Sequence, residues 1–181
     1  MLQLYPIFSD HALFQCDSTL TLRGIADPAA VLTADILKDG VSFAKGTAVA
    51  ANDGTFALTL DTPVGSFDVY SICISTGAET LTLSDIQFGE LWMASGQSNM
   101  EMSNSHQPEC KKMMQDIIGS GIRVYAINYY NDGADPNLFS MTPEDTTAGH
   151  WMTADGTHNW EGVSACATAF VLDIARKFKE S

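Results

Sequence analysis

Short alternating or β-branched runs separated by turn residues fill the first 84 residues, and this pattern restricts the possible fold most strongly. The turn residues include Asp39-Gly40, Asn52-Asp53-Gly54 and Gly77, which favour the backbone conformations of tight turns. Several short strands at this spacing are typical of an antiparallel β-domain. The pattern predicts a small antiparallel β-sandwich with strands over residues 19–25, 31–37, 55–60, 67–75 and 80–88.

The pattern changes near residues 84–88. Residues 86–94 are mainly apolar and predict a strand, residues 108–118 predict a helix, and residues 122–128 predict a second strand. Gly119 and Gly121 follow the predicted helix, as glycines commonly do at a helix C-terminus. A strand, helix and strand in this order indicate the opening of an α/β domain with parallel strands.

The rest of the chain contains a polar stretch and a final helix. Residues 129–160 are rich in Asp, Asn, Gly, Thr and Pro and predict a long loop. Residues 164–179 predict an amphipathic helix, whose buried face would comprise Ala167, Phe170, Val171, Ile174, Ala175 and Phe178. The predicted organisation is a β-sandwich domain over residues 1–85, followed by part of an α/β domain over residues 86–181.

Composition and charge exclude several classes of protein. Hydrophobic residues make up 45% of the chain and charged residues 17%, and no apolar run is long enough to cross a bilayer, so we expect no membrane association. The net charge of −13, from nine basic and 22 acidic residues, opposes binding to nucleic-acid phosphates. It also opposes the binding of other anionic ligands.

The cysteines and the N-terminal residues suggest neither a metal site nor export. Cys16, Cys73, Cys110 and Cys166 form no CxxC pair and have no histidine at metal-ligand spacing, so we expect buried free thiols and no zinc site. The first residues lack a basic region followed by an apolar one. This predicts a cytoplasmic protein, or a secreted one from which a leader has been removed.

Residues 89–102, GELWMASGQSNMEM, carry the clearest chemical signal. The predicted strand ends at Gly96, and a sharp turn there would leave the Ser98 hydroxyl facing outward with the following backbone N–H groups aimed at the same point. This is how a serine nucleophile is commonly presented. The alternative is that Ser98 is a turn residue or a helix N-cap, which serine favours on local grounds.

Gly96-Gln97-Ser98-Asn99-Met100 resembles the first sequence block of SGNH hydrolases, in the form typical of the sialate O-acetylesterase family. Further matches are the segments at residues 7–11 with Gln15, 53–56, Trp151 and 163–165. The resemblance implies a serine carbohydrate esterase that removes O-acetyl groups from sugars without a cofactor. Ser98 would be the nucleophile, its backbone N–H would contribute to the oxyanion hole, and Gln97 and Asn99 would contact the substrate.

The general base and its acid are harder to assign. In the family they come from an Asp-x-x-His block, and Asp155-Gly156-Thr157-His158 fits that pattern. Residues 88–181 hold only about two βα units, however, whereas a doubly wound sheet needs more. We therefore interpret Asp155 and His158 as a chance match in a loop, and His11 as a structural residue of the β-domain.

The predicted protein is thus the N-terminal portion of an acetylesterase, weakly active or inactive as this chain. Two alternatives stay open. One is a compact esterase that uses Ser98, His158 and Asp155. The other is a glycan-binding or interaction module in which Ser98 is inert. The sequence leaves the oligomeric state open.

Overall fold

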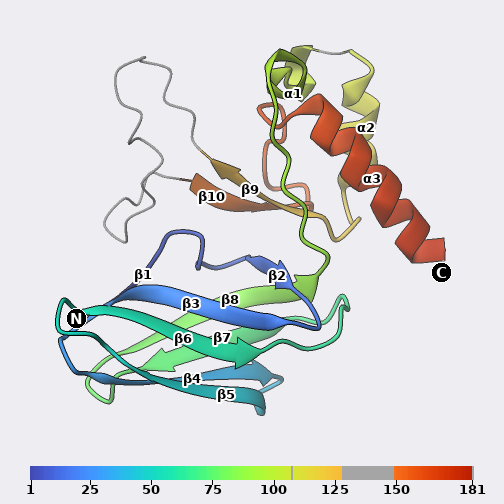
Figure 1. The fold of residues 1–181 in the computed structure, drawn as a ribbon. Helices are drawn as coiled ribbons and strands as arrows, with labels where there is room; N and C mark the ends of the chain where they lie inside the picture. The colour runs from blue at the N-terminus through green and yellow to red at the C-terminus, as the bar shows by residue number, and fades with distance from the viewer. Residues whose placement is uncertain (107, 128–148, 181) are drawn as a thin grey trace, which may run out of the picture. The chain divides into compact units, whose positions relative to one another are not determined.

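The computed structural model describes residues 1–106, 108–127 and 149–180, which are mostly β-structure with a few helices (Figure 1). The described chain forms two compact units. The first unit comprises Met1–Leu91 and the described part of Ile127–Trp151, and the second comprises Trp92–Ala126 and the described part of Met152–Ser181.

Two sheets make up the first unit. The smaller sheet has the strand order β1-β3-β6 with antiparallel pairing, and consists of β1 (Leu2–Leu4), β3 (Thr19–Ala26) and β6 (Thr55–Asp61). The larger has the order β2-β8-β7-β4-β5, and consists of β2 (Leu13–Gln15), β4 (Val31–Lys38), β5 (Val41–Val49), β7 (Tyr70–Ser75) and β8 (Thr80–Gly89). Its pairs are antiparallel except β2 with β8, which is parallel. That parallel pair departs from the fully antiparallel domain that the sequence predicts.

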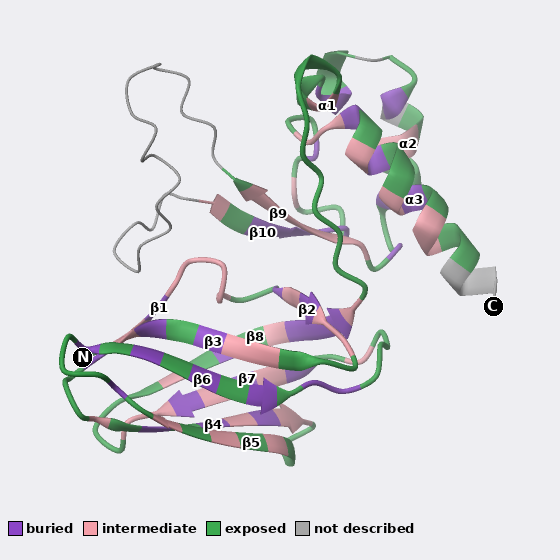
Figure 2. Ribbon diagram, in the orientation of Figure 1, coloured by how far each residue is buried: buried purple, intermediate pink, exposed green. Residues whose placement is uncertain are grey.

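The core of the first unit is built largely from alternate residues of the strands, which gives strands such as β4, β6 and β7 one buried face (Figure 2). The buried side chains include Leu32, Ile36, Leu58, Leu60, Ile72, Ile74, Ile86 and Phe88. Strand β5 approaches β6 so closely that a Cβ atom at Gly46 would lie 2.2 Å from the Thr59 carbonyl oxygen. Glycine at position 46 therefore allows the two strands to approach.

The turn residues act as predicted between β4 and β5. Asp39 and Gly40 have φ angles of 52° and 77°, as a two-residue hairpin turn requires. The sequence analysis missed β5 itself, as well as the three-residue strands β1 and β2. Strand β7 begins at Tyr70 rather than at residue 67.

The predicted strand over residues 86–94 is wrong. Its first residues, including Ile86 and Phe88, belong to β8 and are buried in the first unit, and the strand ends at Gly89. The following residues up to Gly96 are not part of any strand, and Leu91, Trp92 and Met93 are exposed. The apolar run is therefore shared between the end of one strand and a segment outside the sheets.

The second unit contains the helices α1 (Ser98–Glu101), α2 (Cys110–Ile117) and α3 (Ala165–Glu180) and a short 3₁₀ helix, η1 (Asn104–His106). Strand β9 (Arg123–Ile127) pairs with β10 (Gly149–Thr153), and the two run in opposite directions in Figure 1. Strand β10 lies where the sequence predicts a loop, and β9 does not pair with a strand at residues 86–94. The predicted parallel strand–helix–strand arrangement is therefore not found in the described chain, and Asn128 lies outside the described residues.

The two predicted longer helices are present, with a different buried face on α3. The core of this unit joins Ile117, Ala154, Trp160 and Leu172. Along α3, Ala165, Thr168 and Leu172 are buried, whereas Phe170 is 45% exposed. The Phe170 ring packs edge-on against Trp92, with 5.2 Å between ring centroids, which explains its position outside the core. Phe178 was also predicted on the buried face, but its side chain lies outside the described residues.

Three further sequence expectations bear on the described residues. No described helix is long and apolar enough to cross a membrane. All four cysteines are free, but Cys16 and Cys73 are half-buried and Cys166 is exposed, so the expectation of buried thiols is confirmed only for Cys110. Within the described ranges there is no group of three or more His, Cys, Asp or Glu side chains that could hold a metal ion.

Candidate functional site

Ser98 is exposed and is the first residue of α1, a helix of a single turn. The Met100 and Glu101 N–H groups both donate to the Gln97 carbonyl oxygen, at 2.9 and 3.0 Å. The Ser98 and Asn99 N–H groups precede these donors at the N-terminal end of α1, where backbone N–H groups have no acceptor within the helix. The serine hydroxyl and two backbone donors therefore share the start of α1. The preceding segment is not a strand, so the predicted strand-to-helix junction is only half present.

The start of α3 supports α1 from more than 60 residues further along the chain. The Ser164 hydroxyl lies 3.1 Å from Met100 Sδ, and the Cys166 thiol lies 3.4 Å from the Asn99 carbonyl oxygen. The Ala165 N–H donates to the Met102 carbonyl oxygen at 2.9 Å. These contacts fix both ends of the short helix that carries Ser98.

A buried asparagine follows this helix in η1. Asn104 is fully buried, and its amide Nδ2 donates to the Trp160 carbonyl oxygen at 2.8 Å and to Thr168 Oγ1 at 3.0 Å. Its backbone N–H donates to the Val163 carbonyl oxygen at 2.9 Å. The sequence analysis missed Asn104 and Thr168. They are polar residues at positions that no hydrophobic periodicity marks as buried.

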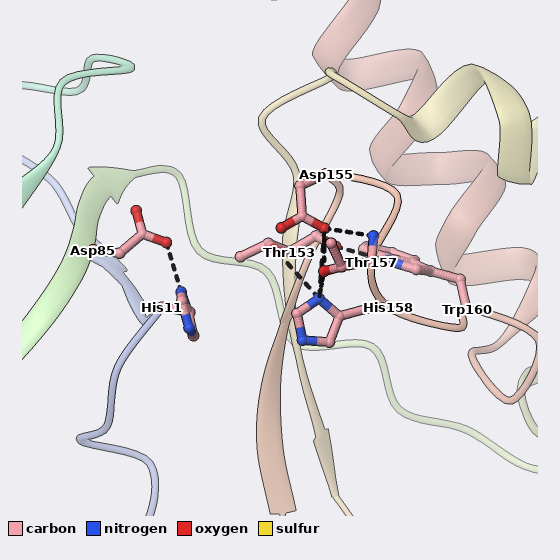
Figure 3. A network of polar contacts seen from close by, with 7 residues as sticks. All are labelled: His11, Asp85, Thr153, Asp155, Thr157, His158 and Trp160. Atoms are coloured by element: carbon pink, nitrogen blue, oxygen red, sulfur yellow. Dashed lines mark hydrogen bonds and ion pairs between the residues drawn. The ribbon is translucent and has the colours of Figure 1, made fainter.

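Asp155 and His158 form a local turn, shown in Figure 3. Asp155 Oδ1 accepts hydrogen bonds from the Thr157 hydroxyl at 2.6 Å and from the Thr157 N–H at 2.8 Å. The hydrogen bond from the Thr157 hydroxyl, followed by the one from the Thr157 N–H, holds the pKa of Asp155 well below its usual range. His158 Nδ1 lies 3.1 Å from Thr153 Oγ1 and 3.2 Å from Thr157 Oγ1, but 3.7 Å from Asp155 Oδ1.

This geometry differs from that of a catalytic histidine and its acid. In a triad the carboxylate holds the imidazole through a direct hydrogen bond, whereas 3.7 Å exceeds hydrogen-bonding distance. Within the described residues, no hydrogen bond or ion pair joins Ser98 to a histidine or a carboxylate. The arrangement therefore supports the interpretation of Asp155 and His158 as part of a turn.

His11 contacts Asp85 within the first unit. Its Nδ1 lies 2.6 Å from Asp85 Oδ2, and the two residues have φ angles of 66° and 53°. The His11 N–H donates to the Ser84 carbonyl oxygen at 3.0 Å. These bonds connect the segment before β2 to the middle of β8, which agrees with a structural role for His11. The side chains of Gln97 and Asn99 are exposed on either side of Ser98, and their contacts with substrate stay a prediction.

Comparison with known proteins gives a partial match. No family model matches the chain. A mouse (Mus musculus) sialate O-acetylesterase is 29% identical over 116 residues, which are 61% of this chain and 21% of that protein. A rat (Rattus norvegicus) sialate O-acetylesterase is 31% identical over 88 residues, which are 46% of this chain and 16% of that protein. The chain thus spans about a fifth of the mouse protein's length.

A solved structure is similar over nearly the whole chain. It is that of a carbohydrate acetylesterase from Xanthomonas citri, with a TM-score of 0.79 and 19% sequence identity, and the match covers 98% of this chain and 38% of that one. At this identity the likeness shows a shared fold. The comparisons confirm the resemblance that the GQSNM segment indicated: over part of its length, this chain is similar to the sialate O-acetylesterase family.

Proposed function

We propose that this chain carries the nucleophile of a serine carbohydrate esterase that removes O-acetyl groups from sugars. The observation that carries the proposal is the exposed Ser98 at the start of α1, beside the backbone N–H groups of Ser98 and Asn99. In finer detail, we propose that the first unit is a small β-sandwich. We propose that the second unit, which begins at Trp92, is the first part of an SGNH α/β domain.

The reaction would be acyl transfer in two steps. Ser98 Oγ attacks the acetyl carbonyl carbon, and the resulting oxyanion accepts a hydrogen bond from the Ser98 N–H. The bond between the acetyl carbon and the sugar oxygen then breaks, and the sugar oxygen takes up the proton that Ser98 Oγ has lost. Water next adds to the acetyl carbon of the acetyl-serine, the bond to Ser98 Oγ breaks, and acetate leaves as Ser98 Oγ regains a proton. Gln97 and Asn99, exposed on both sides of Ser98, would contact the sugar. This chemistry requires no cofactor, and the net charge of −13 favours a neutral acetylated sugar.

The arrangement of Asp155 and His158 supports weak activity or none. A serine hydroxyl needs a base to accept its proton, and the His158 imidazole is oriented by threonine hydroxyls. A glycan-binding module with an inert Ser98 is the alternative that this geometry leaves open. A test of the nucleophile must therefore work without a base.

The substitution Ser98→Cys meets that requirement, because a thiol with an ordinary pKa is partly ionised at pH about 8. The folded variant is treated with p-nitrophenyl acetate, and acetylation of each cysteine is followed by peptide mass spectrometry. Cys166 is exposed in the same unit, and as the second residue of α3 it also lies near a helix N-terminus, so it provides a control thiol for the effect of a helix start alone. Since one oxyanion-hole donor is worth about 10²–10³ in rate in serine enzymes, we expect the thiol at position 98 to be acetylated at least about tenfold faster than Cys166.

A second measurement in denaturant shows whether the fold is responsible. The two rates should converge when the protein is unfolded, because the backbone donors are then no longer arranged around position 98. Equal rates at position 98 and Cys166 in the folded protein would count against Ser98 as a nucleophile and in favour of the inert module.

A further inference from the structure

We propose that Asn104 is a positioning residue for Ser98, which it serves through Trp160 and Thr168; this inference rests on the proposed function. Asn104 lies three residues after the last residue of α1, and its side chain is fully buried. Within the described chain, no hydrogen bond joins Asn104 directly to Ser98. Its effect would pass through the backbone that connects it to α1.

The orientation of the Asn104 amide is determined by its partners. The Trp160 carbonyl oxygen can only accept a hydrogen bond, so the amide nitrogen must face it. The same nitrogen donates to Thr168 Oγ1. One side chain in η1 thus joins the loop before α3 to the first turns of α3.

The amide oxygen indicates that this residue is not optimal for stability. Asn104 Oδ1 is buried and has no hydrogen-bond partner within the described part of the chain. Burying an unpaired polar atom costs free energy, and native proteins contain few such atoms. An amide in this place is therefore better explained by the geometry that it fixes than by the stability that it adds.

The backbone transmits that geometry to Ser98. The Asn104 N–H bonds to the Val163 carbonyl oxygen, Ser103 pairs with Ser164, and the Ala165 N–H bonds to the Met102 carbonyl oxygen. The Met102 N–H in turn donates to the Ser98 carbonyl oxygen at 3.1 Å. A series of backbone hydrogen bonds therefore connects Asn104 to the residue that carries the nucleophile.

The test uses the Ser98→Cys protein and its reaction with p-nitrophenyl acetate. We expect Asn104→Ala to lower the acetylation rate at position 98 by about tenfold or more in the folded protein. The acetylation rate at position 98 in denaturant should be unchanged. Thr168→Val removes the hydroxyl that accepts from the amide and should lower the rate similarly. Thr168→Ser retains the hydroxyl and should keep the rate within about twofold. If Thr168 acted only through the packing of its methyl group, Thr168→Ser would lower the rate as well.

A matched control separates positioning from stability. Leu172→Ala removes a buried side chain from the same helix and should lower the melting temperature while leaving the rate at position 98 unchanged in the folded protein. Amide hydrogen exchange at Met100 and Glu101 gives a second readout, and it should accelerate in Asn104→Ala and Thr168→Val but not in Thr168→Ser. If Asn104→Ala does not fold, the two Thr168 variants still decide the question.

The results distinguish this inference from the proposed function. A parent protein in which position 98 reacts no faster than Cys166 overturns the proposed function and with it the positioning role. A parent with the rate advantage, unchanged by Asn104→Ala and Thr168→Val, overturns the positioning role alone. An equal loss in Leu172→Ala also overturns it, because general loosening of the unit would then explain the effect.

Discussion

Replacing His158 by alanine should leave acetate release by this chain nearly unchanged. The Asp155 carboxylate oxygen nearest the imidazole already accepts two hydrogen bonds from Thr157, and it lies 3.7 Å from His158 Nδ1. Such a pair cannot hold an imidazole as a triad acid does. The expected change for His158→Ala is therefore less than about twofold, against a loss of about 10⁴, or roughly 5.5 kcal/mol in activation free energy, for a working triad.

The assay measures acetate released from an acetylated methyl glycoside and from p-nitrophenyl acetate, with the unchanged chain and with Ser98→Ala and His158→Ala. Ser95→Ala and His150→Ala serve as matched controls, since both side chains are exposed and lie close in sequence to the residues tested. We expect turnover near background for every protein. Turnover well above background that both Ser98→Ala and His158→Ala abolish, with the two controls fully active, would refute this reasoning. It would establish a compact esterase with Ser98, His158 and Asp155.

Two further predictions concern stability. Gly46→Ala should destabilise the first unit by about 1–3 kcal/mol or more in urea unfolding, because the new Cβ would lie 2.2 Å from the Thr59 carbonyl oxygen. Gly162→Ala is the control: a Cβ there has nothing within 4 Å, so the free energy of unfolding should change by less than about 0.5 kcal/mol. Equal effects of the two substitutions would contradict the close approach of β5 and β6. The Lys38 ammonium lowers the pKa of Asp68, so this pair should stabilise the fold at neutral pH and lose its contribution as the pH falls through the folded pKa of Asp68. Urea unfolding of the unchanged chain and Asp68→Asn from pH about 6 to about 2 should show the gap between them closing on acidification, and a constant gap would argue against the ion pair.

The sequence predicted best those elements whose signals are local. The Asp39-Gly40 turn, the glycine after α2 and the presence of the helix α3 each depend on a few neighbouring residues, and the structure contains all three features, although α3 buries a different face from the predicted one. The run at residues 86–94 misled because an apolar run does not reveal which partner buries it: Phe88 is buried in the first unit, and Trp92 packs on Phe170.

The candidate site shows the same division. The GQSNM segment placed Ser98 at the start of a helix, but the contacts that hold the helix come from residues 163–168. Asn104 and Thr168 are polar residues whose burial depends on packing between distant segments, which periodicity in one sequence does not reveal. The role of Ser98 itself stays a prediction until the thiol test is made.

The bond between Asn104 and Thr168 joins residues 64 positions apart, and this has a consequence for the time at which the site forms. Closing a flexible loop of that length costs roughly 4 kcal/mol in chain entropy, apart from a constant. During synthesis, Ser98 emerges well before the first turns of α3, and until those residues follow, the short α1 helix has none of its supports. The serine segment should therefore become ordered only once α3 can pack against it.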